Sequence, residues 1–261
     1  MAHPAMAAMP SQGCGRAATA QTVLSFIVHG VERQAFVVVP SDYRADQPLP
    51  LVLAFHGRTN DNTQLRGYLA LEQAATTSAI FVYPAALRDR TGNFTWVAPD
   101  EGAPDLALFD TILGDLERAY CIDQAAIFLV GHSLGASFAN SLACARADEV
   151  TGVATVAGGI DLNRCTARVA AILLHNPNDE LVPLSQGELA RDVLLGASLP
   201  ASWPVSEIQQ TFACQRAGGP PPPLLWCLYH EDITRNGRYY PHQWPNGASQ
   251  LIMSFFADLI R

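Results

Sequence analysis

The stretch AAIFLVGHSLGASFANSLACA, residues 125–145, decides the fold class. Its first part is a continuous apolar run, typical of a buried strand, and its last part has the small and apolar residues of a packed helix. Between them lies GHSLG, residues 131–135, which matches the pattern G-x-S-x-G. A strand that turns directly into a helix needs small residues at the turn, which Gly131 and Gly135 supply. Ser133 would then lie exposed at the carboxyl end of the strand, as a nucleophile does.

Apolar runs and amphipathic segments alternate over most of the chain. Continuous apolar runs indicate strands buried on both faces, and an apolar period of 3.6 residues indicates helices. This alternation predicts an α/β fold in one domain, with a mostly parallel central sheet and helices on both faces. We expect a hairpin at 22–40, strands at 49–57, 79–84, 125–133, 150–158, 169–176 and 223–230, and helices at 63–77, 104–120, 134–146, 185–197 and 248–260.

The composition argues against several classes of function. The chain has 261 residues, 49% hydrophobic and 15% charged, and a net charge of −8. This suits a folded domain, and the absence of a Lys/Arg cluster argues against nucleic acid as a partner. No apolar run approaches the ~20 residues that span a membrane. The sequence also lacks HExxH, a glycine-rich phosphate loop and a ligand cluster, so we expect no metal and no cofactor.

The six cysteines favour an exported protein. They are even in number, widely spaced and without a CxxC pair, which favours disulfides and a secreted or periplasmic location. Cys214 and Cys227 flank a loop rich in Gly and Pro, and they form our first candidate pair. Residues 1–13 are too short for an intact signal peptide, so we expect an N-terminal tail, left from a signal peptide or added to the chain, before a catalytic domain at 14–261.

A serine nucleophile needs a base, and the base needs an orienting carboxylate. In folds with this strand–turn–helix nucleophile, the chain order is serine, acid, histidine. The segment AILLHNPNDELVP, residues 171–183, is a strand that breaks into a polar turn. A carboxylate just past the strand lies on the active-site side of the sheet. Asp179 is therefore the preferred acid, and Glu180 is the alternative.

Two histidines remain as candidates for the base. His175 precedes the acid and breaks the chain order, and His132 is interpreted as packing behind the serine turn. His230 ends the last strand, whereas His242 lies in NGRYYPHQWPNG, residues 236–247, between the last strand and the last helix. A loop at that place can reach across to the serine, which favours His242 without excluding His230.

The chain resembles the feruloyl esterase and polyhydroxybutyrate depolymerase group of the α/β-hydrolases, which is similar to carbohydrate esterase family 1. The resemblance implies Ser133, Asp179 and His242 as the catalytic triad. Pro241 stands where the family often has Gly, and GHSLG differs from the serine motif of many depolymerases. The stretches that carry the resemblance are GCG at 13–15, FHG at 55–57, the segment from FTW to the serine motif at 94–144, NPNDELVP at 176–183 and PHQWP at 241–245.

The expected reaction is the hydrolysis of a small or polysaccharide-linked ester, most simply a feruloyl ester of the plant cell wall. Depolymerase and acetylxylan esterase activities are alternatives, as is a non-catalytic carbohydrate-binding protein on the same scaffold. Backbone N–H groups of Leu134 and of Arg58, or else Thr59, would bind the oxyanion. Aromatic side chains would form a flat wall for the acyl group, and the candidates are Trp96, Trp244, Tyr239 and Tyr240. For Trp96, packing in the hydrophobic core is an equally good interpretation.

Overall fold

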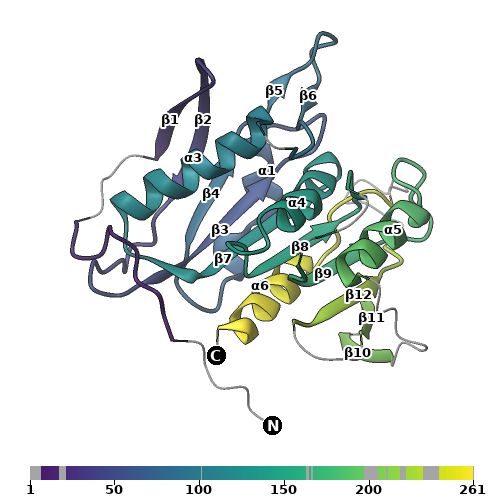
Figure 1. The fold of residues 1–261 in the computed structure, drawn as a ribbon. Coiled ribbons are helices and arrows are strands. Elements are labelled where there is room, and N and C mark those ends of the chain that lie inside the picture. The colour runs from purple at the N-terminus through teal and green to yellow at the C-terminus, as the bar shows by residue number, and fades with distance from the viewer. Residues whose placement is uncertain are drawn as a thin grey trace.

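A ten-stranded sheet forms the centre of the computed structural model, in the order β1-β2-β4-β3-β7-β8-β9-β12-β11-β10 (Figure 1). The six central strands, from β4 to β12, pair in parallel. Antiparallel pairs lie at both edges of the sheet. The prediction of a mostly parallel sheet is therefore confirmed. The structure describes residues 7–17, 22–100, 102–162, 165, 167–196, 205–209, 211–217, 222–231 and 241–260.

The predicted elements recur with modest shifts in their ends, and the structure adds four short strands that the sequence did not predict, namely β5, β6, β10 and β11. The strands are β1 Val23–Val28, β2 Val31–Val38, β3 Leu49–Phe55, β4 Ile80–Pro84, β5 Leu87–Arg88, β6 Phe94–Thr95, β7 Ile122–His132, β8 Gly152–Val156, β9 Ala170–His175, β10 Val205–Gln209, β11 Phe212–Arg216 and β12 Leu224–Leu228. The helices are α1 Asn62–Leu69, α2 Leu71–Ala74, α3 Pro104–Ala119, α4 Leu134–Ala145, α5 Leu184–Leu195 and α6 Ala248–Leu259.

One expected helix is divided into two. The apolar spacing predicts a single helix at 63–77, but Ala70 has φ 49° and ψ 43° and separates α1 from α2. This left-handed conformation ends α1 because it cannot continue a right-handed helix. The hairpin at 22–40 is present, and its turn uses positive φ at both His29 and Gly30. Two consecutive residues with positive φ match the right-handed twist of the paired strands.

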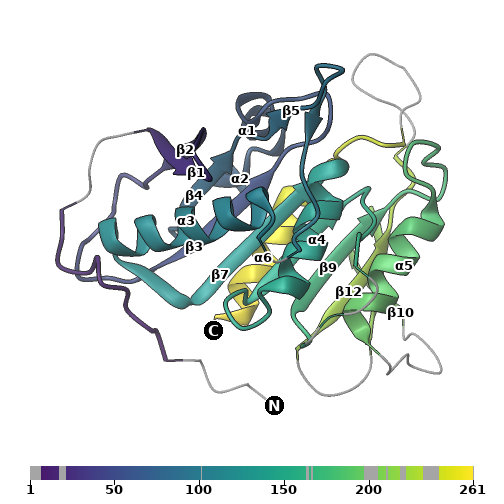
Figure 2. The ribbon, with the colours of Figure 1, turned by 45° about the horizontal axis from the view of Figure 1, so that its top comes forward.

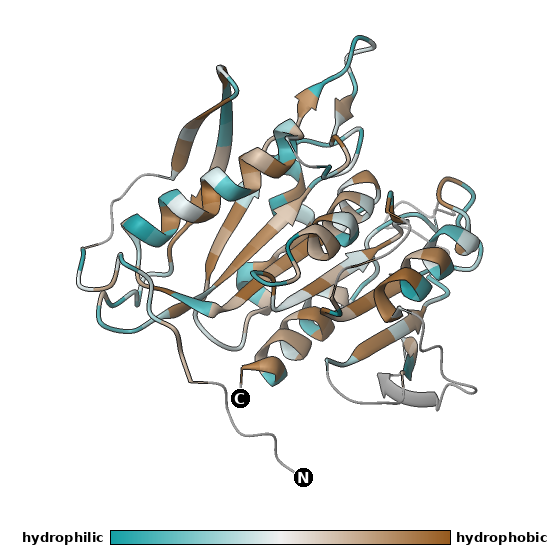
Figure 3. Cartoon of the chain, viewed as in Figure 1, coloured by the Kyte–Doolittle hydropathy of each residue, from teal (hydrophilic) through white to brown (hydrophobic). Residues whose placement is uncertain are grey.

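The sheet separates two hydrophobic cores (Figures 1 and 2). On β3, Leu51, Leu53 and Phe55 belong to the core that α3, α4 and α5 cover, whereas Val52 and Ala54 belong to the core that α1, α2 and α6 cover. This alternation follows from the two-residue period of a strand. Both faces are covered, which explains why the central strands are mainly hydrophobic (Figure 3). The layered arrangement leaves the carboxyl ends of the central strands as the place where loops can gather.

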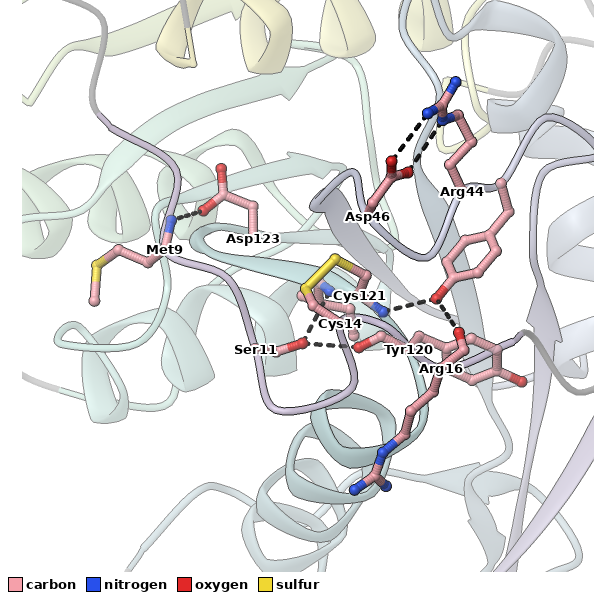
Figure 4. The surroundings of a disulfide bond; sticks show 11 residues. Met9, Ser11, Cys14, Arg16, Arg44, Asp46, Tyr120, Cys121 and Asp123 are labelled. Atoms are coloured by element: carbon pink, nitrogen blue, oxygen red, sulfur yellow. Dashed lines mark hydrogen bonds and ion pairs between the residues drawn. A yellow bond between two sulfur atoms is a disulfide. The ribbon is translucent and has the colours of Figure 1, made fainter.

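The N-terminal segment is fastened to the start of β7 (Figure 4). Cys14 forms a disulfide with Cys121. The hydroxyl of Ser11 donates to the carbonyl oxygen of Tyr120 at 2.7 Å and accepts from the N–H of Ile122 at 3.0 Å. A Cβ atom at Gly13 would lie 2.2 Å from the Tyr120 carbonyl oxygen, so only glycine fits there. Residues 11–13, which fall in the expected tail, thus pack against the domain.

The described cysteines are all paired in disulfides. Cys144 of α4 bonds to Cys165, and Cys214 bonds to Cys227. The latter two occupy opposite positions in the register of β11 and β12, which confirms the candidate pair. Within the described part of the chain, no helix has the length and apolar character that crossing a membrane requires.

Candidate active site

Ser133 lies at a sharp turn between β7 and α4. Its backbone has φ 58° and ψ −124°, a conformation that costs a non-glycine residue on the order of 1–3 kcal/mol. A Cβ atom at Gly131 would lie 2.4 Å from the carbonyl oxygen of Gly135, and one at Gly135 would lie 2.1 Å from that of Phe55. Both glycines are therefore required by close backbone contacts. The turn lifts the Ser133 side chain into a cavity at the carboxyl end of the sheet.

His242 joins the serine to a buried carboxylate. Its Nε2 atom lies 2.8 Å from the Oγ atom of Ser133, and its Nδ1 atom lies 2.6 Å from the Oδ2 atom of Asp179. Because the carboxylate only accepts, the Nδ1 atom carries the proton and the Nε2 atom accepts from the serine hydroxyl. The structure thus brings together Ser133, Asp179 and His242, in the protonation pattern that deprotonation of the serine requires.

The loop after β9 holds Asp179 in place. Its Oδ1 atom accepts from the N–H groups of Leu181 at 2.9 Å and Val182 at 3.0 Å. Burial alone would raise the pKa of Asp179, but the hydrogen bonds from His242, Val182 and Leu181 outweigh burial and lower it below its usual range. The carboxylate therefore stays ionised and can stabilise a positive charge on His242.

The alternative acid and base lie outside this arrangement. The side chains of Glu180 and His230 are exposed and do not line the cavity. His175 is buried, and its Nε2 atom donates to the carbonyl oxygen of Val182 at 2.8 Å. It supports the loop that carries Asp179.

The loop after β3 lies against the serine turn. A Cβ atom at Gly57 would be 3.3 Å from the Cβ atom of Ser133. His56 donates from Nδ1 to the Gly57 carbonyl oxygen at 2.9 Å, and its Nε2 atom accepts from the N–H of Ala86 at 3.0 Å. In a trans peptide the carbonyl of Gly57 and the N–H of Arg58 point in opposite directions. His56 therefore turns the Arg58 N–H away from its own ring.

Two backbone N–H groups remain the predicted oxyanion donors. Leu134 is the first residue of α4, so its N–H has no partner within the helix. Arg58 and Thr59 both line the cavity, so the choice between them stays a prediction. The side chain of Arg58 contacts Asp89 at 3.0 Å, and its backbone N–H is the group predicted to bind the oxyanion.

The cavity beside Ser133 has a volume of about 1060 Å³. This is slightly above the range of about 300–1,000 Å³ that is typical of small-molecule sites. Its walls are mixed in character. The apolar residues include Leu134, Leu181, Val182, Trp244 and Pro245, and the polar residues include Asn60, Glu231, Gln243 and Asn246. An amphipathic ester would find both apolar contacts and hydrogen-bonding groups here.

The structure corrects one of the expected aromatic contacts. Trp96 is only 6% exposed, and it packs between Phe55 and Phe138 with ring centroids 5.3 and 5.1 Å away. Its Nε1 atom donates to the His56 carbonyl oxygen at 2.9 Å, so the indole belongs to the core and does not line the cavity. Trp244 does line the cavity, whereas Tyr239 and Tyr240 lie outside the described residues.

Three cavity residues were missed or interpreted differently from the sequence. Tyr68 of α1 and Tyr229 after β12 both line the cavity, although neither lies in a recognisable motif. His132 lies beside the base, with its ring centroid 5.5 Å from that of His242, and not behind the turn.

Among the described residues, no group of three or more His, Cys, Asp or Glu side chains could hold a metal ion.

Comparison with known proteins identifies the family. The chain is 32% identical to a probable feruloyl esterase C of Aspergillus niger over 191 residues, which cover 69% of this chain and 66% of that protein. It is 31% identical to feruloyl esterase D of Neurospora crassa over 210 residues, which cover 73% and 69%. The chain belongs to the feruloyl esterase family. The expected resemblance is thereby confirmed, and the match to the Aspergillus relative spans just under two thirds of that feruloyl esterase.

The fold of this feruloyl esterase family member also recurs among solved structures. A ferulic acid esterase of carbohydrate esterase family 1 from Anaeromyces mucronatus, in complex with ferulic acid, matches with a TM-score of 0.59. The two chains are 16% identical, and the match covers 97% of each. At this identity the match shows the fold alone, which is that of the α/β-hydrolases. No family model matches the chain.

Proposed function

We propose that this protein is a serine carboxylesterase that hydrolyses hydroxycinnamoyl esters, such as feruloyl esters of plant cell-wall polysaccharide. One observation carries the proposal: the imidazole of His242 bonds Ser133 on one side, at 2.8 Å, and Asp179 on the other, at 2.6 Å. Membership of the feruloyl esterase family supports the choice of ester. The three disulfides support action outside the cytosol.

The proposed reaction proceeds through an acyl-serine. The Oγ atom of Ser133 attacks the ester carbonyl while the Nε2 atom of His242 takes its proton. The tetrahedral intermediate collapses, and His242 returns the proton to the leaving alcohol. Water then repeats the sequence and releases the carboxylic acid. Asp179 orients the imidazole and stabilises its charge throughout.

Two features of the site favour an aromatic acyl group. Trp244 and Tyr68 contribute to the cavity wall, and stacking on such rings adds ~0.5–1.5 kcal/mol beyond burial. The polar residues Asn60 and Asn246 offer partners for hydroxyl groups at the same cavity.

The Leu134 and Arg58 N–H groups would each lower the barrier by ~3 kcal/mol as oxyanion donors.

The test compares three esters and two serine variants. Methyl ferulate, a hydroxybutyrate oligomer and acetylated xylan separate the three ester classes, and methyl ferulate is expected to give the highest kcat/KM. Ser133→Ala should abolish hydrolysis and labelling by a fluorophosphonate probe. Ser25→Ala, at an exposed position on β1, serves as the matched control. Retained hydrolysis in Ser133→Ala would contradict the mechanism, and an unlabelled wild-type protein would favour a non-catalytic binding function.

A further inference from the structure

The loop that carries the base is held by side chains from the body of the domain. Residues 241–247 lie outside helices and strands. Three consecutive carbonyl oxygens of this loop nevertheless face hydrogen-bond donors. The one proton of the Tyr229 hydroxyl is shared between the carbonyl oxygens of Pro241 and Gln243, each 3.1 Å away, and the Nε2 atom of His132 lies 2.8 Å from the carbonyl oxygen of His242. The main chain is thus fixed at the base itself and on both sides of it.

The bond from His132 determines the position of its proton. A carbonyl oxygen only accepts, so the Nε2 atom of His132 carries the hydrogen. The Nδ1 atom is then an acceptor, and it takes the hydroxyl proton of Tyr68 at 2.8 Å. Tyr68, His132 and the His242 carbonyl therefore form a continuous chain from α1 to the base loop. In the neutral form of His132, both ring nitrogens are thus satisfied, Nε2 as a donor and Nδ1 as an acceptor.

The surroundings keep His132 neutral. Burial lowers its pKa to about 4, and the charge of His242 acts in the same direction, whereas the bond to the His242 carbonyl and the charge of Asp179 oppose it. The two imidazole centroids are only 5.5 Å apart. A second positive charge at this distance would destabilise the imidazolium that His242 forms during the reaction. A neutral His132 avoids that repulsion.

A similar hydrogen bond from a buried histidine to a loop carbonyl occurs at two other strands of the sheet. His56 follows β3 and donates to the Gly57 carbonyl, and His175 ends β9 and donates to the Val182 carbonyl. His132 ends β7, which lies between them in the sheet. Each of these three buried histidines thus fastens a carbonyl in a different loop of the site, namely the expected oxyanion loop, the acid loop and the base loop. Burial lowers the pKa of His56 and of His175 as well.

We propose that His132 is a positioning residue: it holds the main chain of His242 so that the imidazole stays between Ser133 and Asp179, and Tyr68 fixes the tautomer that makes this bond. The proposal rests on the proposed esterase function. The Ser133 contact is 2.8 Å long, so a small shift of the loop would break the hydrogen bond through which the proton passes. Misplacement by about 1 Å can reduce a rate on the order of 100-fold.

The first test uses two substitutions of the same residue. His132→Met fills the space without a donor, whereas His132→Gln keeps an N–H that can reach the His242 carbonyl. Kinetics with p-nitrophenyl acetate are normalised to sites that react with a fluorophosphonate probe, so unfolded protein does not count. We expect kcat in His132→Met to fall about 10- to 100-fold with KM changed less than threefold. His132→Gln should recover most of kcat.

The outcomes separate positioning from packing. A wild-type kcat per reactive site in His132→Met would overturn the proposal, even if the melting temperature falls. Equal losses in the Met and Gln variants would also overturn it, because volume and not the hydrogen bond would then decide the rate. Tyr68→Phe should lower kcat less than His132→Met does, and an unchanged kcat would remove Tyr68 from the proposal.

A second test does not depend on activity. In ¹⁵N NMR of the wild-type protein at pH 6.5, His132 is expected to be neutral with its proton on Nε2. A proton on Nδ1, or on both nitrogens, would overturn the proposal whatever the kinetics show. Failure of the wild-type protein to react with the fluorophosphonate probe would instead count against the esterase function, and the NMR result would still decide whether His132 makes the bond.

Discussion

The Nδ1 atom of His242 lies 2.6 Å from the Oδ2 atom of Asp179, although 63 residues separate them in the chain. The two loops that carry them follow β12 and β9, which are neighbours in the sheet. Their meeting is a consequence of strand order, since parallel strands end at the same edge. The carboxylate thereby fixes which nitrogen of the base faces Ser133.

Asp179→Asn is expected to lower kcat about 10³- to 10⁴-fold, because the amide can donate to Nδ1 and favour the wrong tautomer. Glu180→Gln is the matched control, since it neutralises the next carboxylate, which is exposed. Hydrolysis of methyl ferulate by both variants provides the measurement. A large loss in Glu180→Gln with a small loss in Asp179→Asn would reverse the assignment of the acid.

Acid is expected to destabilise the fold in part through His132. Its pKa is lowered from 6.5 to about 4 in the folded protein, so below pH 6.5 the unfolded chain binds a proton that the folded chain does not. The stability due to the neutral ring is therefore complete above pH 6.5 and is lost as the pH falls toward 4. Each pKa unit corresponds to about 1.4 kcal/mol, so the loss between pH 7 and 4.5 is about 2–3 kcal/mol.

Urea unfolding of the wild-type protein and of His132→Met at both pH values measures this contribution. The variant should lose less stability on acidification than the wild-type protein. The buried His56 and His175 act in the same direction and remain in both proteins. An equal loss in the two proteins would show that His132 does not contribute to the pH dependence.

Gly135→Ala is expected to prevent formation of the native turn, or to destabilise the protein by at least about 4 kcal/mol, because the new Cβ atom would lie 2.1 Å from the Phe55 carbonyl oxygen. Gly67→Ala is the matched control in α1, where nothing lies within 4 Å of the new atom. It should stabilise the protein by about 0.5–1 kcal/mol. Thermal and urea unfolding of both variants test the contrast, and a tolerated Gly135→Ala would contradict the close contact.

Removing the Cys14–Cys121 disulfide should destabilise the protein more than removing Cys214–Cys227. The first closes a loop of 107 residues and the second a loop of 13. Loop-closure entropy predicts about 4.7 and 3 kcal/mol, respectively. Double Cys→Ala variants, compared by their free energies of unfolding, measure the difference. The opposite order would indicate that native contacts near Cys14, such as those of Ser11, hold the N-terminal segment without the disulfide.

The elements that could be predicted are those whose signal is local. The central strands could be predicted because burial on both faces requires continuous apolar runs. The serine turn could be predicted because its close backbone contacts require glycine at positions 131 and 135 of the motif GHSLG. The pairing of Cys214 with Cys227 could be predicted because the two residues flank one short loop. The division of the helix at Ala70 could not be predicted, because alanine favours helix and its left-handed conformation gives no signal in the sequence.

The roles of Trp96 and His132 depend on contacts between distant segments. Trp96 lies in one of the motifs that carry the family resemblance, which suggested a place at the site. In the structure its indole N–H donates to the His56 carbonyl oxygen and its ring packs on Phe138. His132 bonds a residue 110 positions away. Sequence spacing carries no information on such bonds, so an aromatic or histidine near a motif could be assigned to the core or to the cavity only once the fold was known.

The formation of an acyl-enzyme on Ser133 tests the proposed function most directly. The protein would be mixed with methyl ferulate, quenched in acid within the first turnovers, and digested for mass spectrometry. We expect a feruloyl group on the peptide that contains Ser133, in wild-type protein and in Ser25→Ala, and none in Ser133→Ala. Continued turnover of methyl ferulate in Ser133→Ala, or an acyl group on another residue, would contradict the assignment of Ser133 as the nucleophile.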